Sequence, residues 1–341
     1  MRRGFGSDNH AGVHPDVLAA IAAANEGHAQ SYGHDELTER VEGLFREHFG
    51  ADARAYLVFN GTGANVVALR AMCRPWEGVI CPATAHLEVD ECGAPEAMAG
   101  VKLLTVETPD GKLRPADVAA RVRRVGDEHS VQARVVSISN STELGTLYSP
   151  DEVRALADAA HERDLLLHVD GARLANAAAA LDRPLSALTS DCGVDAVSFG
   201  GTKNGLLVGE AVVMQRPGPA DELLYLRKQS MQLASKMRFL AAQFETLLGS
   251  GLWRELAGHS NAMARRLAEA LRDAPGVRIT QEPQANALFA VIAREAAEKL
   301  RESWFFYDWD EASGEVRWMC SWDTTAEDVD EFAAAVRSAT A

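Results

Sequence analysis

The sequence predicts an α/β protein, with a larger domain built on a mostly parallel sheet and a smaller C-terminal α/β domain. Two observations predict this class. Before residue 250, short apolar runs rich in β-branched residues alternate with helical stretches, and near residue 250 this pattern changes. Strands that are apolar throughout are typical of a parallel sheet that helices cover on both faces.

The first part contains seven apolar runs that we expect to form strands. Helical stretches such as Asp151 to Arg163 separate them, as in repeated strand–helix units. A helix-like stretch also runs from Leu223 to Phe244. In chain order the expected strands are YLVF (56–59), GVIC (78–81), VKLLTV (101–106), RVVSIS (134–139), LLLHV (165–169), DAVSF (195–199) and AVVM (211–214).

The part after residue 250 is expected to form a smaller sheet with antiparallel strands. A helical segment around Asn261 to Arg272 precedes this sheet, and a helix from Ala326 closes it. The expected strands are GVRIT (276–280), ALFAVI (287–292), WFFYDW (304–309) and VRWMCSW (316–322).

The first forty residues hold little apolar sequence beyond an expected helix from His14 to Asn25. They have too little apolar surface for a core of their own, so we expect them to pack on another part of the chain or on a neighbouring subunit. The predicted division is therefore an N-terminal arm (1–40), a large domain (41–250) and a small C-terminal domain (251–341).

Composition and charge exclude several classes of partner. The chain has 49 acidic and 34 basic residues, a net charge of −15, and no stripe of Lys and Arg, so nucleic acid is not expected as a partner. No apolar run is long enough for a signal peptide or a membrane span, so we expect a cytoplasmic protein. The five scattered cysteines form no CxxC pair, and no metal site is expected.

Ligands of open α/β sheets bind beyond the carboxyl ends of the strands, so the residues that follow the expected strands are candidates. The segment NGTGAN (60–65) follows YLVF and precedes the helix-like VVALRAM. Its small residues let backbone N–H groups approach a ligand, and a helix N-terminus favours an anion. The segment is therefore either a phosphate site or a simple tight turn.

Three side chains after other expected strands are further candidates. Asp170 ends LLLHV and could cap a helix, bind a metal or keep a pyridine nitrogen protonated. Lys203 stands alone as a basic residue between Arg183 and Arg216, and a desolvated lysine can attack an aldehyde. His86 follows GVIC, where spacing alone favours a helix-capping or core histidine.

Arg317 lies in an aromatic, strand-like region, where an unpaired charge would be costly. A bidentate carboxylate ligand would satisfy it. An internal salt bridge with a nearby acid is the alternative, and the sequence leaves both open.

The joint pattern resembles a known family. A phosphate segment, a histidine, Asp-Gly-Ala-Arg and a glycine-flanked lysine, each after a strand-like run, are similar to those of the low-specificity L-threonine aldolases. These are fold-type I pyridoxal 5′-phosphate (PLP) enzymes that also resemble β-eliminating lyases. The resemblance spans essentially the whole chain and rests on SDN (7–9), NGTGAN (60–65), AHLEVDECGAPE (85–96), HVDGARLANA (168–177), FGGTKNG (199–205) and RWMCSWDT (317–324).

The resemblance implies a role for each candidate residue. Lys203 would hold PLP as a Schiff base, and Asp170 would pair with the pyridinium nitrogen. Gly61 and Thr62 would bind the phosphate, while His86 would stack on the ring and assist proton transfer at the substrate hydroxyl. The residues expected to bind the substrate carboxylate are Ser7, Arg173 and Arg317, with Arg173 counted among the cofactor-binding residues as well.

The reaction implied is PLP-dependent retro-aldol cleavage of L-threonine, L-allo-threonine and other β-hydroxy-α-amino acids to glycine and an aldehyde. Phenylserine cleavage, β-elimination and racemisation on the same scaffold are alternatives, as is a non-catalytic PLP-binding protein. A NAD-binding domain is disfavoured because no GxGxxG precedes an acid by about 20 residues. The sequence does not choose between threo and erythro substrates, or between threonine and β-aryl substrates.

The resemblance also implies a homotetramer built as a dimer of dimers, although composition does not separate dimer from tetramer. A basic residue of a neighbouring subunit could contact the phosphate, and Lys228, Lys236 and Arg238 are equal candidates unless they line a solvated helix face. Related aldolases use a second histidine near the substrate hydroxyl. His129 is either that residue or an exposed loop histidine, so the base at the hydroxyl stays unassigned.

Overall fold

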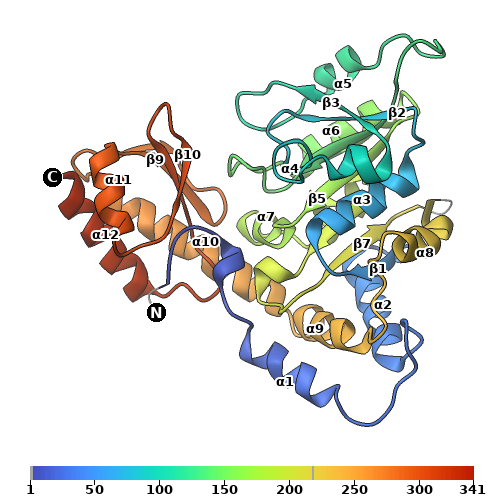
Figure 1. Ribbon diagram of the computed structural model, residues 1–341, viewed down its shortest axis with the longest axis horizontal. Helices are drawn as coiled ribbons and strands as arrows, with labels where there is room; N and C mark the ends of the chain where they lie inside the picture. Colours follow the sequence, from blue (N-terminus) through green and yellow to red (C-terminus); the bar gives the residue numbers. More distant parts are fainter. Residues whose placement is uncertain (1–2, 217–218) are drawn as a thin grey trace.

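The computed structural model describes residues 3–216 and 219–341, and within these residues seven strands form one sheet in the order β1-β7-β6-β5-β4-β2-β3 (Figure 1). Strand β7 pairs antiparallel with β1 and β6, whereas the other neighbours pair parallel. The prediction of a mostly parallel sheet is therefore confirmed. The strands are β1 (Arg54–Val58), β2 (Glu77–Pro82), β3 (Lys102–Val106), β4 (Gln132–Ser139), β5 (Leu166–Gly171), β6 (Ala196–Gly200) and β7 (Glu210–Met214).

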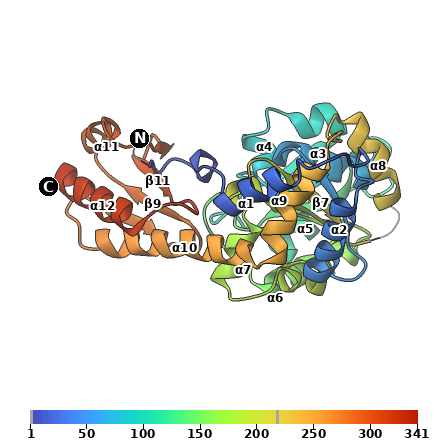
Figure 2. The same ribbon diagram turned by 90° about the horizontal axis from the view of Figure 1, so that it is seen from below.

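Helices cover both faces of this sheet (Figures 1 and 2). Helices α3 and α8 pack on one face, and α2, α6, α7 and α9 pack on the other. The bounds are α1 (Pro15–Ala23), α2 (Glu36–Phe49), α3 (Gly61–Met72), α4 (His86–Val89), α5 (Pro115–Arg121), α6 (Pro150–His161), α7 (Leu174–Ala180), α8 (Pro219–Gln229), α9 (Arg238–Gly249), α10 (Leu252–Leu271), α11 (Arg294–Arg301) and α12 (Ala326–Thr340).

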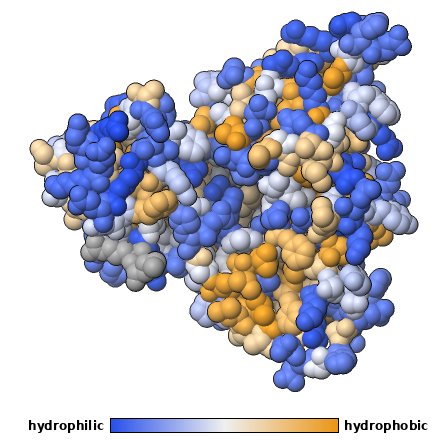
Figure 3. All heavy atoms as spheres, in the orientation of Figure 1, coloured by the Kyte–Doolittle hydropathy of each residue, from blue (hydrophilic) through white to orange (hydrophobic). Residues whose placement is uncertain are grey.

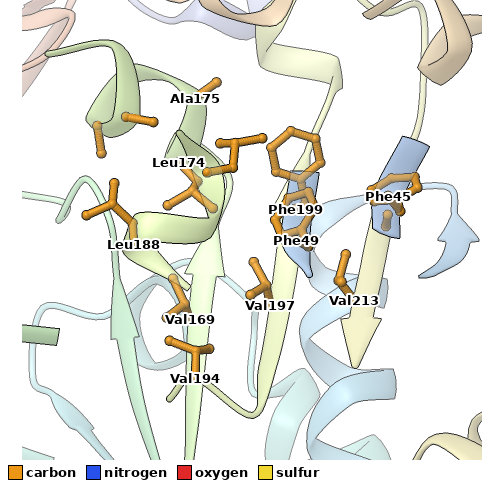
Figure 4. Packing of buried hydrophobic residues seen from close by; sticks show 14 of the residues in the cluster. Phe45, Phe49, Val169, Leu174, Ala175, Leu188, Val194, Val197, Phe199 and Val213 are labelled. Carbon is orange, nitrogen blue, oxygen red and sulfur yellow. The ribbon is translucent and has the colours of Figure 1, made fainter. Parts of the chain in front are cut away.

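Successive residues of a strand point to opposite faces, which explains why the central strands are apolar throughout. Val135 and Val136 of β4 are both buried but belong to different apolar clusters, one on each face of the sheet. On the second face the ring centroids of Phe49 and Phe199 lie 5.1 Å apart, next to Phe45 (Figure 4). This double burial holds the carboxyl ends of β4, β5 and β6 in fixed positions.

A second sheet lies in the C-terminal part, where the described strands follow the order β10-β11-β9-β8 and every pair is antiparallel, as predicted. Helices α10, α11 and α12 supply its apolar core, in which the ring of Trp318 packs edge-on against Phe332. Helix α10 runs between the two parts (Figure 2). The strands are β8 (Arg278–Gln281), β9 (Ala287–Val291), β10 (Tyr307–Asp310) and β11 (Glu315–Met319).

The N-terminal residues contact both parts of the chain. The amide N–H of Phe5 donates to the Phe305 carbonyl, and Met319 donates to the Phe5 carbonyl, both at 2.8 Å. Helix α1 packs on α9 of the larger part. The division at residues 40 and 250 stays a prediction, and residues 1–2 and 217–218 lie outside the described residues.

Some predicted elements differ from those in the structure. The helix-like stretch from Leu223 to Phe244 is interrupted, because α8 ends at Gln229 and α9 begins at Arg238. Between them Met231 has a φ of 61°, and the side chain of Gln232 accepts a hydrogen bond from the Phe59 amide at 2.9 Å. A tertiary contact thus interrupts a segment of good helix formers.

Element boundaries also shift. Helix α3 begins at Gly61, so most of NGTGAN forms the first turn of a helix rather than a separate turn before it. Helix α10 begins at Leu252, nine residues before the predicted start, while β10 begins only at Tyr307. In the parts of the chain that the structure describes, no helix has the length and apolar character needed to cross a bilayer.

Candidate active site

A pocket lies beyond the carboxyl ends of β4 and β5, where open α/β sheets bind their ligands. It gathers residues from segments that are far apart in the sequence. Five of the predicted site residues line it, whereas Thr62, Ser7 and Arg317 are not among the lining residues. The lining residues are Gly61, Asn65, His86, Ser139, Ser141, Glu143, Asp170, Ala172, Arg173 and Lys203.

The first turn of α3 forms one end of the pocket. Asn60 caps this helix by accepting a hydrogen bond from the Gly63 amide at 2.7 Å. A Cβ atom built on Gly61 would meet no atom within 4 Å, so the space in front of this residue is open. Helix N-termini attract anions through their unpaired N–H groups, so this end of the pocket suits a phosphate.

Asp170, at the end of β5, is held in place by hydrogen bonds to both carboxylate oxygens. Asn65 Nδ2 donates to Oδ2 at 2.9 Å, and the Ala172 amide donates to Oδ1 at 3.1 Å. The same Asn65 nitrogen donates to Glu91 Oε1 at 2.7 Å. The two hydrogen bonds to Asp170 fix its carboxylate at the pocket, where it could pair with a ring nitrogen.

Lys203 lies in the 3₁₀ turn that follows β6 (Thr202–Asn204) and lines the pocket. Its Nζ has no hydrogen-bond or salt-bridge partner within the described residues. Burial, together with the charge of Arg173, lowers the Lys203 pKa. An amine that is more often neutral is a better nucleophile toward an aldehyde.

Glu210 of β7 is buried behind this turn, and the sequence analysis missed it. It accepts a hydrogen bond from the Gly201 amide at 2.8 Å. Burial raises the pKa of Glu210 to about 7. Glu210 therefore anchors the chain two residues before Lys203.

His86 is the first residue of α4, and its side chain is about one-third exposed. Its Nδ1 lies 2.8 Å from Glu91 Oε1, a contact in which the ring nitrogen donates to the carboxylate. This contact raises the His86 pKa. Glu91 thus orients the imidazole through Nδ1 and leaves the other ring nitrogen, Nε2, outside this contact. Glu91 was not among the residues predicted from the sequence.

Arg173 is already paired within the protein. Its Nε donates to Asp8 Oδ2 at 2.6 Å and its Nη2 donates to Asp8 Oδ1 at 2.9 Å. Asp8 also accepts from Asn286 Nδ2 at 3.1 Å. Arg173 reaches the pocket as part of this ion pair and not as a free guanidinium.

Arg317 has a different environment. Its Nε is buried without a hydrogen-bond partner, and its guanidinium lies 4.8 Å from the centre of the Trp309 ring. Burial and the charge of Arg173 lower its pKa to about 10. Within the residues that the structure describes, the internal salt bridge is absent, so Arg317 is a partly buried cation without an anionic partner.

Ser7 and His129 lie apart from the pocket. Ser7 accepts a hydrogen bond from the Asn9 amide at 3.2 Å and borders a separate hollow with Arg3 and His10. The side chain of His129 is 79% exposed and precedes β4, at the strand end opposite to the pocket. None of Lys228, Lys236 and Arg238 lines the pocket either.

Known proteins resemble this chain over nearly its whole length. Residues 4–295 match the model of a family described as beta-eliminating lyases. A low specificity L-threonine aldolase of Pseudomonas aeruginosa is 44% identical, with 98% of this chain and 96% of that protein covered. Another, from a Pseudomonas species, is also 44% identical, with 98% and 97% covered. The structure of Leishmania major threonine aldolase is 31% identical, covers 99% of both chains and superimposes with a TM-score of 0.93.

Proposed function

The chain belongs to the beta-eliminating lyase family, and we propose that it is a PLP-dependent aldehyde-lyase that cleaves L-threonine and L-allo-threonine to glycine and acetaldehyde. Other β-hydroxy-α-amino acids would give glycine and the corresponding aldehyde. The observation that carries the proposal is the pocket in which the unpartnered amine of Lys203 and the fixed carboxylate of Asp170 lie together. The threonine aldolase relatives at 44% identity support the same reaction.

The lining residues fit PLP. Lys203 would bind the cofactor covalently, Asp170 would pair with its ring nitrogen, and the open space at Gly61, with Thr62 beside it, would receive the phosphate. His86 would cover one face of the ring. The bound cofactor supplies an electron sink for the pair of electrons left on Cα when a bond to that carbon breaks.

Two arginines would orient the substrate. Arg317 lacks an anionic partner, so it is the stronger candidate for a bidentate contact with the substrate carboxylate. Arg173 would contact the same carboxylate from a position that Asp8 fixes. Ser7 borders a different hollow, so its role at the carboxylate stays a prediction.

In the proposed reaction, a base takes the proton of the β-hydroxyl group while the Cα–Cβ bond breaks. The hydroxyl carbon becomes the carbonyl carbon of the aldehyde, and Cα receives a proton to give glycine. The arginines would set which bond of Cα stands perpendicular to the ring, and this orientation would decide which bond breaks.

Phenylserine cleavage, β-elimination and racemisation would use the same cofactor-holding residues, so the test is by product. Purified, PLP-loaded protein is mixed with L-threonine or L-allo-threonine, and aldehyde is followed by a coupled alcohol dehydrogenase. Acetaldehyde and glycine, lost in Lys203→Ala, support the proposal. Pyruvate and ammonia would favour elimination, and a protein without a visible PLP band would contradict PLP chemistry altogether.

A homotetramer built as a dimer of dimers is also proposed. Apolar side chains gather at the surface in the region of α1 and α9 (Figure 3), and Leu18 of α1 is half exposed. Lys228, Lys236 or Arg238 would then approach the phosphate of a neighbouring subunit. Sedimentation with and without PLP tests this assembly, and a monomer would contradict it. The cytoplasmic location stays a prediction.

A further inference from the structure

Glu143 lines the pocket, and the proposed roles leave its carboxylate unused. It follows β4 by four residues and lines the pocket together with Asp170 and Lys203. Its Oε1 accepts two hydrogen bonds, from Ser139 Oγ at 2.6 Å and from the His86 amide at 3.0 Å. Its Oε2 is buried and has no hydrogen-bond partner among the described residues. The carboxylate is therefore fixed through one oxygen and has the other free to accept a proton.

The other carboxylates near the pocket are engaged differently. Both oxygens of Asp170 accept hydrogen bonds, and the proposed function assigns this residue to the ring nitrogen. Glu91 binds His86 and Asn65, and it does not line the pocket. Glu143 is thus the lining carboxylate with a free oxygen in the described part of the chain.

The electrostatics favour Glu143 over His86 as the proton acceptor. Burial and the charge of Asp170 raise the pKa of Glu143, although its two hydrogen bonds oppose this shift. A carboxylate with a raised pKa takes a proton more readily. The contact with Glu91 raises the pKa of His86 and so favours the imidazolium, which has no lone pair to accept a proton.

We propose that Glu143 is the base that removes the proton from the substrate β-hydroxyl group, an inference that rests on the proposed aldolase function. The O–H bond breaks and its proton moves to Glu143 Oε2, while the freed electron pair forms the C=O bond of the aldehyde. The Cα–Cβ bond breaks, its electron pair remains with the glycine fragment, and Cα takes up a proton. One proton leaves the hydroxyl and one reaches Cα, so none is consumed overall.

The test compares Glu143→Gln with the wild-type protein, both loaded with PLP. Glutamine keeps the volume and an oxygen that accepts from Ser139 and His86, but it is not a base. A positioned general base contributes about 100-fold to 10,000-fold in rate. We therefore expect kcat for L-threonine to fall by about 100-fold or more, while KM changes by less than about 3-fold.

Glycine provides a second readout because it has no β-hydroxyl group. Exchange of its Cα proton in D₂O, followed by NMR, is expected to stay within about 3-fold of wild type in Glu143→Gln, and the visible PLP band is expected to persist. Glu128→Gln is the matched control, since it removes the same charge from a side chain that is 91% exposed before β4. It should change neither rate.

The outcomes separate this inference from the proposed function. A wild-type protein that forms no aldehyde would refute the proposed function, and the inference would fall with it. If the wild type is active and Glu143→Gln keeps kcat within about 3-fold, the inference is wrong. Loss of glycine exchange together with kcat would mean that Glu143 acts by holding the cofactor site, which also overturns it.

Glu143→Asp provides a second test in case the glutamine variant does not fold. It keeps a carboxylate but withdraws it by one methylene. We expect partial activity with normal glycine exchange, above the level of Glu143→Gln where that variant folds. Full wild-type activity in Glu143→Asp, or loss of glycine exchange, would contradict a base that must reach the substrate hydroxyl.

Discussion

Arg173 and Asp8 form a two-contact ion pair, with 2.6 Å between Nε and Oδ2 and 2.9 Å between Nη2 and Oδ1. Asp8 belongs to the N-terminal arm, and Arg173 follows β5 of the larger sheet. The pair therefore joins the N-terminal arm to the pocket. The position of Arg173 at the pocket is set by a residue 165 positions away.

Replacing Asp8 with Asn is expected to lower the free energy of unfolding by about 3–5 kcal/mol, because it leaves the largely buried Arg173 charge without its partner. Chemical denaturation at pH 7 measures this loss. Asp16→Asn is the control, since that side chain is 74% exposed. A loss below about 1 kcal/mol in Asp8→Asn would show that water replaces the pair.

The same pair predicts a pH dependence. Arg173 holds the pKa of Asp8 below its ordinary value, so the ionised pair stabilises the fold above the unfolded-state pKa of about 4. This contribution is lost as pH falls through the lower folded-state pKa. The difference in unfolding free energy between wild type and Asp8→Asn should therefore shrink below about pH 4, and a constant difference would argue against the ion pair as its source.

Replacing Arg317 and replacing Arg173 are expected to have different effects on the thermal midpoint of unfolding. Arg317 has no anionic partner, so Arg317→Gln should keep or raise the thermal midpoint while raising KM for threonine by about 10-fold to 100-fold, the worth of a charge-assisted contact. Arg173→Gln strands the buried Asp8 and should lower the thermal midpoint. Thermal unfolding and steady-state kinetics on both variants test this contrast. Equal loss of stability would mean that Arg317 has a structural partner.

The sequence predicted the sheet because its strands are buried on both faces and are therefore apolar throughout. It did not predict the end of α8, since the segment from Ser230 to Met237 contains good helix formers. A hydrogen bond from the Phe59 amide to Gln232, more than 170 residues away, and the positive φ of Met231 decide that local structure. A local sequence pattern cannot predict contacts between residues that are so far apart in the sequence.

The site residues were predictable where a reactive or charged side chain directly follows an apolar strand. Asp170, Lys203 and His86 were found by that rule and do line one pocket. Glu143 obeys the same rule, but it lies in SNSTELG, which resembles an ordinary polar turn, so it was overlooked. The pairing of Arg173 with Asp8 has no sequence signal, because only the folded chain brings these residues together.

Replacing Glu210 is expected to shift the pH at which the visible band of the PLP-loaded protein changes. It is ionised above its pKa of about 7, and its charge then raises the Lys203 pKa. Glu210→Gln keeps an acceptor for the Gly201 amide but removes the charge. The pH at which the visible band of the PLP-loaded protein changes should therefore fall in the variant, because the protonated nitrogen on Lys203 loses a nearby anion. An unchanged or higher midpoint would contradict an electrostatic role for Glu210.

The pH profile of the reaction depends on the hydrogen bond from Ser139 to Glu143. Burial raises the pKa of Glu143 above its ordinary 4.5, and Ser139 Oγ counteracts part of that shift by donating to Oε1. A base must be ionised to act, so the rate should fall as pH drops through this pKa. The titratable and charged groups that interact with Glu143, through the His86 amide or by charge, are Cys81, His86, Tyr148, Asp170 and Arg173.

Ser139→Ala removes the hydrogen bond and should move the acidic limb of kcat to higher pH, while the rate on the plateau changes little. Ser141→Ala is the matched control, because Ser141 also lines the pocket but makes no hydrogen bond with Glu143 among the described residues. A limb that stays in place in Ser139→Ala would mean that another group, such as His86, controls it. A limb that moves in both variants would point to a general change in the pocket, since only one of the two serines touches the carboxylate.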